Sequence, residues 1–196
     1  MELLFQKDAY LEACEAEVTG VSEDGIRLSQ TVFYPTGGGQ PGDTGVLTLA
    51  DGSEVQIIEA RKGDSLDDVV HIPAEGSTLP AVGDTVTASL DWDRRYRHMC
   101  FHTCMHVLGS IIEGAVTGGN LAADKARLDF NLPDGPPDKI ETTEKLNAVI
   151  GEGHAIGTRW ITDEELDANP SLVRTMSVQP PRGAGRIRLL DIEGVD

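Results

Sequence analysis

Apolar and polar residues alternate in short runs along the first 92 residues of the chain. The runs are rich in valine, isoleucine, leucine and threonine, and glycine, aspartate or proline separates them. This alternation is typical of half-buried strands, and turn residues between the runs are typical of an all-β domain. Six strands are predicted: AEVTGV, GIRLSQTVFY, TGVLTL, EVQIIEA, DVVHIP and TVTASLDW. Their spacing favours a small β-barrel or sandwich over residues 1–92.

From Asp93 the apolar residues take a helical spacing. The predicted helix runs to about Ala115, and its buried stripe consists of Met99, Val107, Leu108, Ile111 and Ile112. We place the domain boundary here, so that the second domain comprises residues 93–196. An all-β first domain followed by a mixed second one makes the predicted fold class α+β.

The second domain continues with shorter elements. A Gly-Gly-Asn turn at 118–120 precedes a predicted strand ARLDFNL, and a helix follows over ETTEKLNAVIGEGHA, with Thr142 or Thr143 as its cap and Gly151 and Gly153 at its end. Three further elements are predicted: a strand in GTRWITD, a short helix in DEELDAN and a strand in RIRLLDIEGVD.

The net charge of −17 argues against broad, sequence-independent binding to nucleic acid, because such binding relies on lysine and arginine to neutralise phosphates. Local basic patches stay open, or these arginines instead pair with some of the 33 carboxylates. The candidates are Arg94, Arg95, Arg97, Arg182, Arg186 and Arg188. The N-terminus has no basic region followed by an apolar run, so we expect a cytoplasmic protein with reduced cysteines.

The segment RHMCFHTCMH, residues 97–106, contains three of the five histidines and two of the three cysteines. On a helix, His102 and His106 project from one face and can reach one ion. Cys100 and Cys104 form a second pair, offset by roughly 200°, so one ion cannot bind both pairs. We therefore expect the cysteines to be buried small hydrophobes. His98, one turn further back, is either a third ligand or an outer or phosphate contact, and we favour the outer role.

A histidine pair at this spacing has two interpretations. It is either half of a metal site or an incidental pair on a helix surface. Thr103 stands where a zinc protease carries its glutamate, which disfavours peptide hydrolysis of that type.

The glycine-rich segment FYPTGGGQPGDTG, residues 33–45, is the second unusual stretch. No Gly-Lys-Ser/Thr follows and the next residues, VLTL, read as a strand, so neither a P-loop nor a Rossmann loop is indicated. Its backbone can approach another surface closely. The alternative is a hairpin loop whose glycines serve turn geometry alone.

The two motifs, in the order TVFYPTGGGQPGDTGVL and then DWDRRYRHMCFHTCMHVL, resemble the AlaX-type alanyl-tRNA editing proteins. These are freestanding relatives of the editing domain of alanyl-tRNA synthetase, and the resemblance extends to RIRLLDIEGVD. It implies a small β-barrel domain followed by an α/β two-layer editing domain. It also implies that His102 and His106 bind zinc and that the glycine-rich loop lies near the editing pocket.

In that family a Cys-x-x-x-His pair follows a strand like RIRLLDIEGVD, whereas this chain ends at Asp196. Either the protein is a naturally short member or the chain is a fragment of a longer protein; we expect the fragment. As given, the chain is expected to bind zinc weakly or not at all, because two imidazoles fall short of the usual ligand number, and it could be inactive for that reason.

The resemblance implies hydrolysis, in trans, of serine or glycine from mischarged alanine tRNA. Gly37, Gly38, Gly39, Gln40 and Asp129 are the expected substrate contacts, with Asp129 alternatively an exposed charge on a strand. The expected phosphate contacts to the tRNA are Arg94, Arg95 and Arg97. A catalytically inactive tRNA-binding module and a zinc hydrolase of small esters or amides are the alternatives. We expect a monomer.

Overall fold

The computed structural model describes residues 1–172 and 186–195, so Arg182 lies outside the described residues. The chain forms two compact units, Met1–Met99 with Ala122–Asp124, and Cys100–Leu121 with Lys125–Asp196. The expected boundary at 92/93 coincides with the start of a helix, α2 (Trp92–Ile111), and the compact units divide within that helix.

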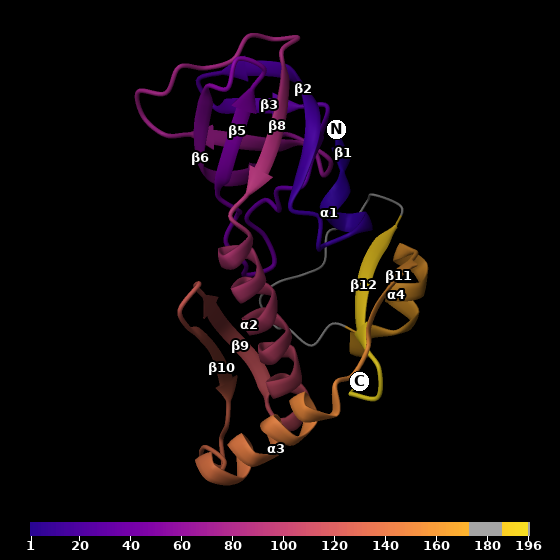
Figure 1. Cartoon of the computed structure of the whole chain (residues 1–196). Coiled ribbons are helices and arrows are strands. Elements are labelled where there is room, and N and C mark those ends of the chain that lie inside the picture. The colour runs from indigo at the N-terminus through magenta and orange to yellow at the C-terminus, as the bar shows by residue number, and fades with distance from the viewer. Residues whose placement is uncertain (173–185, 196) are drawn as a thin grey trace. The chain divides into compact units, whose positions relative to one another are not determined.

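The first unit contains a closed barrel of six strands, and this confirms the predicted β-barrel. Figure 1 shows the barrel with most of its strands labelled. The strands are β2 (Ala13–Ser22), β3 (Gly25–Leu28), β5 (Gly45–Leu49), β6 (Glu54–Lys62), β7 (Val69–Pro73) and β8 (Thr85–Leu90). Their order around the barrel is β2-β3-β7-β6-β5-β8. Alternate residues of each strand point inward and form one apolar core, which is why the period of two was readable in the sequence.

The predicted strand GIRLSQTVFY is two elements in the structure. β3 ends at Leu28, and a second strand, β4 (Gln30–Thr31), pairs in parallel with β1 (Glu2–Leu3). A four-residue helix, α1 (Leu4–Lys7), follows β1. These short elements were not predicted, because a two-residue strand has no readable periodicity.

The helix α2 begins one residue earlier than predicted and ends before Ala115, which opens the next strand. Asp91 caps its first turn, where its Oδ1 atom accepts a hydrogen bond from the Arg94 N–H at 3.1 Å. Of the predicted stripe only Val107 is buried, and the other four residues are partly exposed.

The second unit combines helices with two two-stranded antiparallel sheets, which completes the predicted α+β class. One sheet pairs β9 (Ala115–Leu121) with β10 (Ala126–Asn131), and the other pairs β11 (Ile156–Ile161) with β12 (Ile187–Ile192). The helical elements are α3 (Lys139–Glu152), α4 (Asp163–Ala168) and the 3-10 turn Pro170–Leu172. Ile161, Leu166 and Ile187 form its apolar cluster.

Two details of the second unit differ from the predictions. The Gly-Gly-Asn segment lies inside β9, because Gly118 and Gly119 pair directly opposite Asp129 and Leu128 of β10. The cap of α3 is Asp138 and not a threonine, since its carboxylate accepts both the Ile140 and the Glu141 N–H at 2.9 Å. Gly153 ends the helix as predicted, in a left-handed conformation.

None of the helices in the described part of the chain has the length and apolar content needed to cross a membrane.

Candidate functional site

The glycine-rich segment forms a tight two-residue hairpin turn at the end of the barrel. The N–H of Gly37 donates to the Gln40 carbonyl and the N–H of Gln40 donates to the Gly37 carbonyl, both at 3.0 Å. Gly38 and Gly39 occupy the turn with φ of +58° and +80°. Residues other than glycine rarely adopt positive φ values at two successive positions, so the turn geometry requires both glycines. Gln40 itself is buried.

The turn is fixed to the neighbouring strand β6. The Thr36 N–H donates to the Ala60 carbonyl at 2.9 Å, and the Gly42 N–H donates to the Thr36 hydroxyl at 2.8 Å. A Cβ at Gly42 would lie 1.9 Å from the Ala60 carbonyl oxygen, so glycine is needed for this approach. The Tyr34 hydroxyl also donates to the Gly37 carbonyl at 2.9 Å.

Arg95 is buried within the first unit, where it forms an ion pair with Asp43. Its Nε donates to both Asp43 carboxylate oxygens at 2.9 and 2.8 Å, and its remaining nitrogens donate to the Val32 and Ala9 carbonyls. The side chain is 3% exposed. The expectation that Arg95 contacts tRNA phosphates is therefore wrong, because its donors are already used inside the protein.

The other two arginines lie differently. Arg94 is partly buried and its Nη1 donates to the Gly42 carbonyl at 2.7 Å, so it supports the glycine-rich segment. Arg97 is exposed. Arg97 therefore keeps its predicted role as a phosphate contact, and Arg94 could serve RNA only with the part of its guanidinium that remains accessible.

The second unit brings His102 and His106 together on α2. Their rings stack with centroids 5.0 Å apart and planes inclined by 22°. Burial, and secondarily the neighbouring His106, lowers the pKa of His102 to about 4. His102 is thus a neutral imidazole at physiological pH, which is the form that binds a metal.

Zinc fits this pair in donor chemistry, but the described residues supply only half of a site. Among residues 1–172 and 186–195, no group of three or more histidine, cysteine, aspartate or glutamate side chains could hold a metal ion together. Two imidazoles provide two of the four positions of a tetrahedral zinc shell. Among the described residues, the pair therefore supplies at most two ligands of a metal site.

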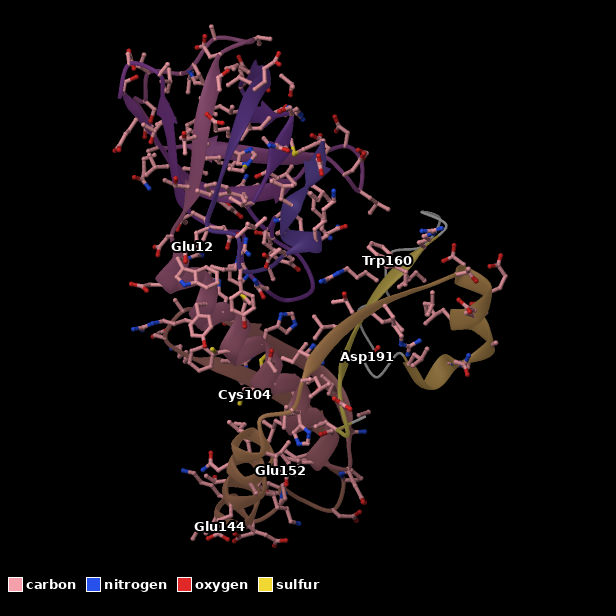
Figure 2. All side chains as sticks on the ribbon, turned by 45° about the vertical axis from the view of Figure 1, so that its right-hand side comes forward. Glu12, Cys104, Glu144, Glu152, Trp160 and Asp191 are labelled. Carbon is pink, nitrogen blue, oxygen red and sulfur yellow. The ribbon has the colours of Figure 1, made fainter. Side chains whose placement is uncertain are left out.

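The cysteines do not occupy the buried positions that we predicted. Cys100 is exposed and Cys104, labelled on α2 in Figure 2, is partly exposed. From Cys100 onward, Val107 is the one buried residue of α2, so the apolar face of the helix is narrower than its sequence pattern suggests. Burial, followed by the neighbouring Cys100, raises the pKa of the Cys104 thiol, which disfavours a thiolate ligand at neutral pH.

His98 is also placed differently from the prediction. It belongs to the first unit, is 1% exposed, and cannot reach a phosphate in solvent from that position. Burial, followed by the nearby Arg94 charge, lowers its pKa. His98 is therefore a neutral interior residue.

Asp129 lies on β10 of the second unit, opposite Gly118 on β9. Its Oδ1 atom forms an ion pair with Nε of Arg127 at 3.0 Å, and its side chain is 40% exposed. A Cβ on Gly118 would lie 3.2 Å from the other carboxylate oxygen, so the glycine leaves room for this side chain. Both predicted roles, a pocket residue and an exposed charge on a strand, fit this position.

Sequence reasoning missed the partner of Arg95 and a lysine beside the glycine turn. Asp43 belonged to the quoted glycine-rich segment, but 52 positions separate it from Arg95. Lys62, at the end of β6, lies against Gly37. Neither contact leaves a local signal, because both join residues that are distant in the sequence.

The comparisons with known proteins agree with both motifs. Residues 6–94 match the family model described as tRNA synthetases class II (A). Two proteins named alanyl-tRNA editing protein AlaX-M are similar over nearly the whole chain. The one from Methanosarcina acetivorans is 37% identical, with 99% of this chain and 83% of the relative covered. The one from Saccharolobus solfataricus is 30% identical, with 100% and 83% covered.

An alanine–tRNA ligase is similar as well. The ligase of Pyrococcus furiosus is 34% identical over 98% of this chain, which corresponds to 21% of the ligase. The similarity to the editing proteins therefore spans most of both chains, whereas the similarity to the ligase is confined to one portion of it. The chain belongs to the AlaX family of alanyl-tRNA editing proteins.

Proposed function

We propose that this protein is a trans-editing hydrolase that removes serine or glycine from mischarged alanine tRNA in the cytoplasm. The observation that carries the proposal is the near full-length similarity to proteins named for alanyl-tRNA editing, in a chain that presents a stacked pair of imidazoles with a lowered His102 pKa. A hydrolytic editor is chemically necessary because a pocket for alanine excludes smaller glycine and near-isosteric serine only weakly.

The reaction is the addition of water to the ester carbonyl and the breaking of the bond to the terminal ribose oxygen. Its products are the free amino acid and an uncharged tRNA with its hydroxyl restored. A zinc ion held by His102 and His106, with further ligands, would supply Lewis-acid chemistry toward water or toward the substrate's amino and hydroxyl groups. Two imidazoles alone do not fix which of these applies.

The roles of the chain's own residues follow from their positions. In the first unit, Gly37, Gly38 and Gly39 present backbone without side chains, so that an aminoacylated 3′ end can approach them closely, with Gln40 as the next contact. In the second unit, Asp129 offers a carboxylate to an amino group. Arg97 is the exposed cation among the three arginines first assigned to tRNA phosphates. Arg94 and Arg95 support the glycine-rich segment indirectly, because they donate hydrogen bonds to the Gly42 carbonyl and the Asp43 carboxylate.

Deacylation of purified charged tRNAs tests the proposal. We expect release of serine or glycine from mischarged alanine tRNA, with correctly charged alanine tRNA spared. His102→Ala should reduce the rate, and His154→Ala is the matched control, because His154 pairs with Glu152 at 2.8 Å outside the histidine pair. Full activity in His102→Ala would contradict the assignment of the imidazoles.

A tRNA-binding module without catalytic activity is the second candidate. It is favoured by the fact that the described residues place no third metal-binding side chain beside the histidine pair. Binding of alanine tRNA without release of either amino acid would support this candidate. A small-ester hydrolase is distinguished by activity that does not require the acceptor stem.

A further inference from the structure

A lysine side chain from β6 lies against the glycine turn, and the proposed function assigns it no role. Lys62 is the last residue of β6 and is exposed. A Cβ built on Gly37 would lie 2.9 Å from both Cε and Nζ of Lys62. The ammonium group therefore lies directly against the backbone of the turn, in the space that a side chain at Gly37 would fill.

The backbone of the turn is open on the side of its tip. Nothing lies within 4 Å of a Cβ position at Gly39. Within the described residues, the backbone hydrogen bonds of the turn are those between Gly37 and Gln40, and neither the Gly38 nor the Gly39 N–H donates to a carbonyl. Successive N–H groups in a tight turn can bind an anion, and glycine lets the anion approach closely.

The charges around Lys62 leave its ammonium available. Glu59 forms an ion pair with Arg61 at 2.7 Å, and Asp68 forms one with Arg27 at 3.2 Å. Both carboxylates are thus neutralised by arginines. In the part of the chain that the structure describes, no hydrogen bond or ion pair holds the Lys62 ammonium itself.

The position of Lys62 is fixed by the hairpin that follows it. The Gly63 N–H donates to the Asp68 carbonyl at 2.9 Å, and the Asp64 N–H donates to the Asp68 carboxylate at 3.0 Å. On the other side of the turn, the Tyr34 hydroxyl holds the Gly37 carbonyl. The backbone at Lys62 and the turn are therefore held in place before a ligand arrives, which limits the backbone entropy lost on binding.

We propose that Lys62 and the N–H groups of Gly38 and Gly39 form a binding site for one backbone phosphate of RNA, and that this site holds the acceptor strand of the tRNA. This inference rests on the proposed function for the identity of the RNA. It assigns to the glycine turn a specific ligand, a phosphodiester, and adds a residue that the motif does not contain.

Salt-dependent binding of an alanine tRNA acceptor minihelix tests the site. Lys62→Gln keeps most of the methylene stem and removes the charge. It should weaken binding by about two- to fivefold, the range of an exposed ion pair, and lower the slope of log affinity against log salt by about 0.7 to 0.9. Lys62→Arg should restore the slope. Lys145→Gln, which removes an exposed lysine paired with Glu141 at 2.7 Å, should leave the slope unchanged.

Amide NMR with two probes identifies the source of the phosphate. Addition of the minihelix should shift the Gly38 and Gly39 amide resonances in the wild type and much less in Lys62→Gln. Inorganic phosphate should shift them only weakly. Saturation by inorganic phosphate with no response to the minihelix would overturn the assignment to RNA.

The outcomes separate this inference from the proposed function. Normal deacylation together with an unchanged salt slope in Lys62→Gln would overturn the phosphate site and leave the editing function standing. A reduced slope in a protein that deacylates no tRNA would support the phosphate site and favour the module without catalytic activity. Failure of the wild type to bind the minihelix would overturn the phosphate site, and the deacylation assay decides the proposed function separately.

Discussion

Asp43 and Arg95 form a buried ion pair that joins the glycine-rich segment to the first turns of α2. Nε of Arg95 donates to both carboxylate oxygens, and the two side chains are 1% and 3% exposed. The Tyr34 N–H also donates to Asp43, at 2.6 Å. One carboxylate thus organises both ends of the segment around the turn.

Asp43→Asn should destabilise the first unit strongly. The substitution leaves the Arg95 guanidinium buried without a counter-charge, which costs about 3–5 kcal/mol in comparable buried pairs. Urea unfolding measures the loss. Lys7→Gln, which breaks the exposed pair with Glu2, should leave the midpoint almost unchanged. An Asp43→Asn protein with the wild-type midpoint would show that the pair does not stabilise the unit.

Gly42→Ala should be far more damaging than Gly37→Ala. At Gly42 the new Cβ would meet the Ala60 carbonyl oxygen at 1.9 Å, and backbone cannot move aside without breaking the Thr36 hydrogen bond to Ala60. At Gly37 the new Cβ would meet only the end of the Lys62 side chain, which is flexible. Thermal unfolding should therefore show a large drop for the first variant and a small one for the second. Equal losses would place the close approach of the two strands in doubt.

Gly39→Ala and Gly52→Ala form a matched pair for separating stability from function. Their φ values are +80° and +84°, and nothing lies within 4 Å of either Cβ position. Each substitution should cost about 1 kcal/mol of stability through backbone strain alone. Only Gly39→Ala should also slow deacylation and weaken tRNA binding, because only Gly39 lies in the turn proposed to meet the RNA. Equal activity in the two variants would remove Gly39 from the substrate contacts.

Several of these relationships could be predicted from the sequence and others could not. The six barrel strands were predictable because each inward-facing residue must be apolar. Apolar and polar residues therefore alternate along each strand. The His102 and His106 pair was predictable because both residues lie on one helix, four positions apart. The exposure of Cys100 was not, since it depends on what packs against the helix.

Contacts between distant segments account for the rest of the errors. Arg95 resembled Arg94 and Arg97 in the sequence, and only its contact with Asp43, 52 positions away, sets it apart. The placement of Lys62 on Gly37 also joins distant segments, because the turn is hydrogen-bonded to the neighbouring strand β6. Such pairings depend on strand order, β2-β3-β7-β6-β5-β8, which the alternation of residues does not encode.

Acid should destabilise the barrel through His71. Burial lowers the pKa of this imidazole from 6.5 to about 4, despite the opposing hydrogen bond to the Ile26 carbonyl at 3.0 Å. The unfolded chain therefore binds a proton between pH 6.5 and 4 that the folded protein does not. The free energy of unfolding therefore keeps its full His71 contribution above pH 6.5. It decreases as the pH falls toward 4, by roughly 3 kcal/mol at most.

Unfolding free energies measured from pH 7.5 to 4.5 test this sign. In His71→Gln the pH dependence between 6.5 and 4 should be smaller than in the wild type, by up to one proton. His102, with its own pKa lowered to about 4, contributes in the same direction, so the comparison is made between variants. Identical curves for wild type and His71→Gln would contradict the interior role of this histidine.

Zinc binding by the 196-residue chain should be weak and should depend on His102. Two imidazoles supply two ligands, whereas stable zinc sites use three or four protein ligands. Because the pKa of His102 is about 4, protons do not compete for this nitrogen between pH 6 and 8. Titration against a chromophoric chelator measures this affinity.

His102→Gln should abolish the residual zinc binding and His154→Gln should not affect it. Both variants remove one imidazole, so nonspecific binding to surface histidines changes equally in the two. Tight equimolar binding that survives His102→Gln would show that the metal uses other ligands, and the pair on α2 would then be an incidental stack. Loss of binding in His102→Gln alone would identify the two stacked rings as the zinc-binding half of an editing site.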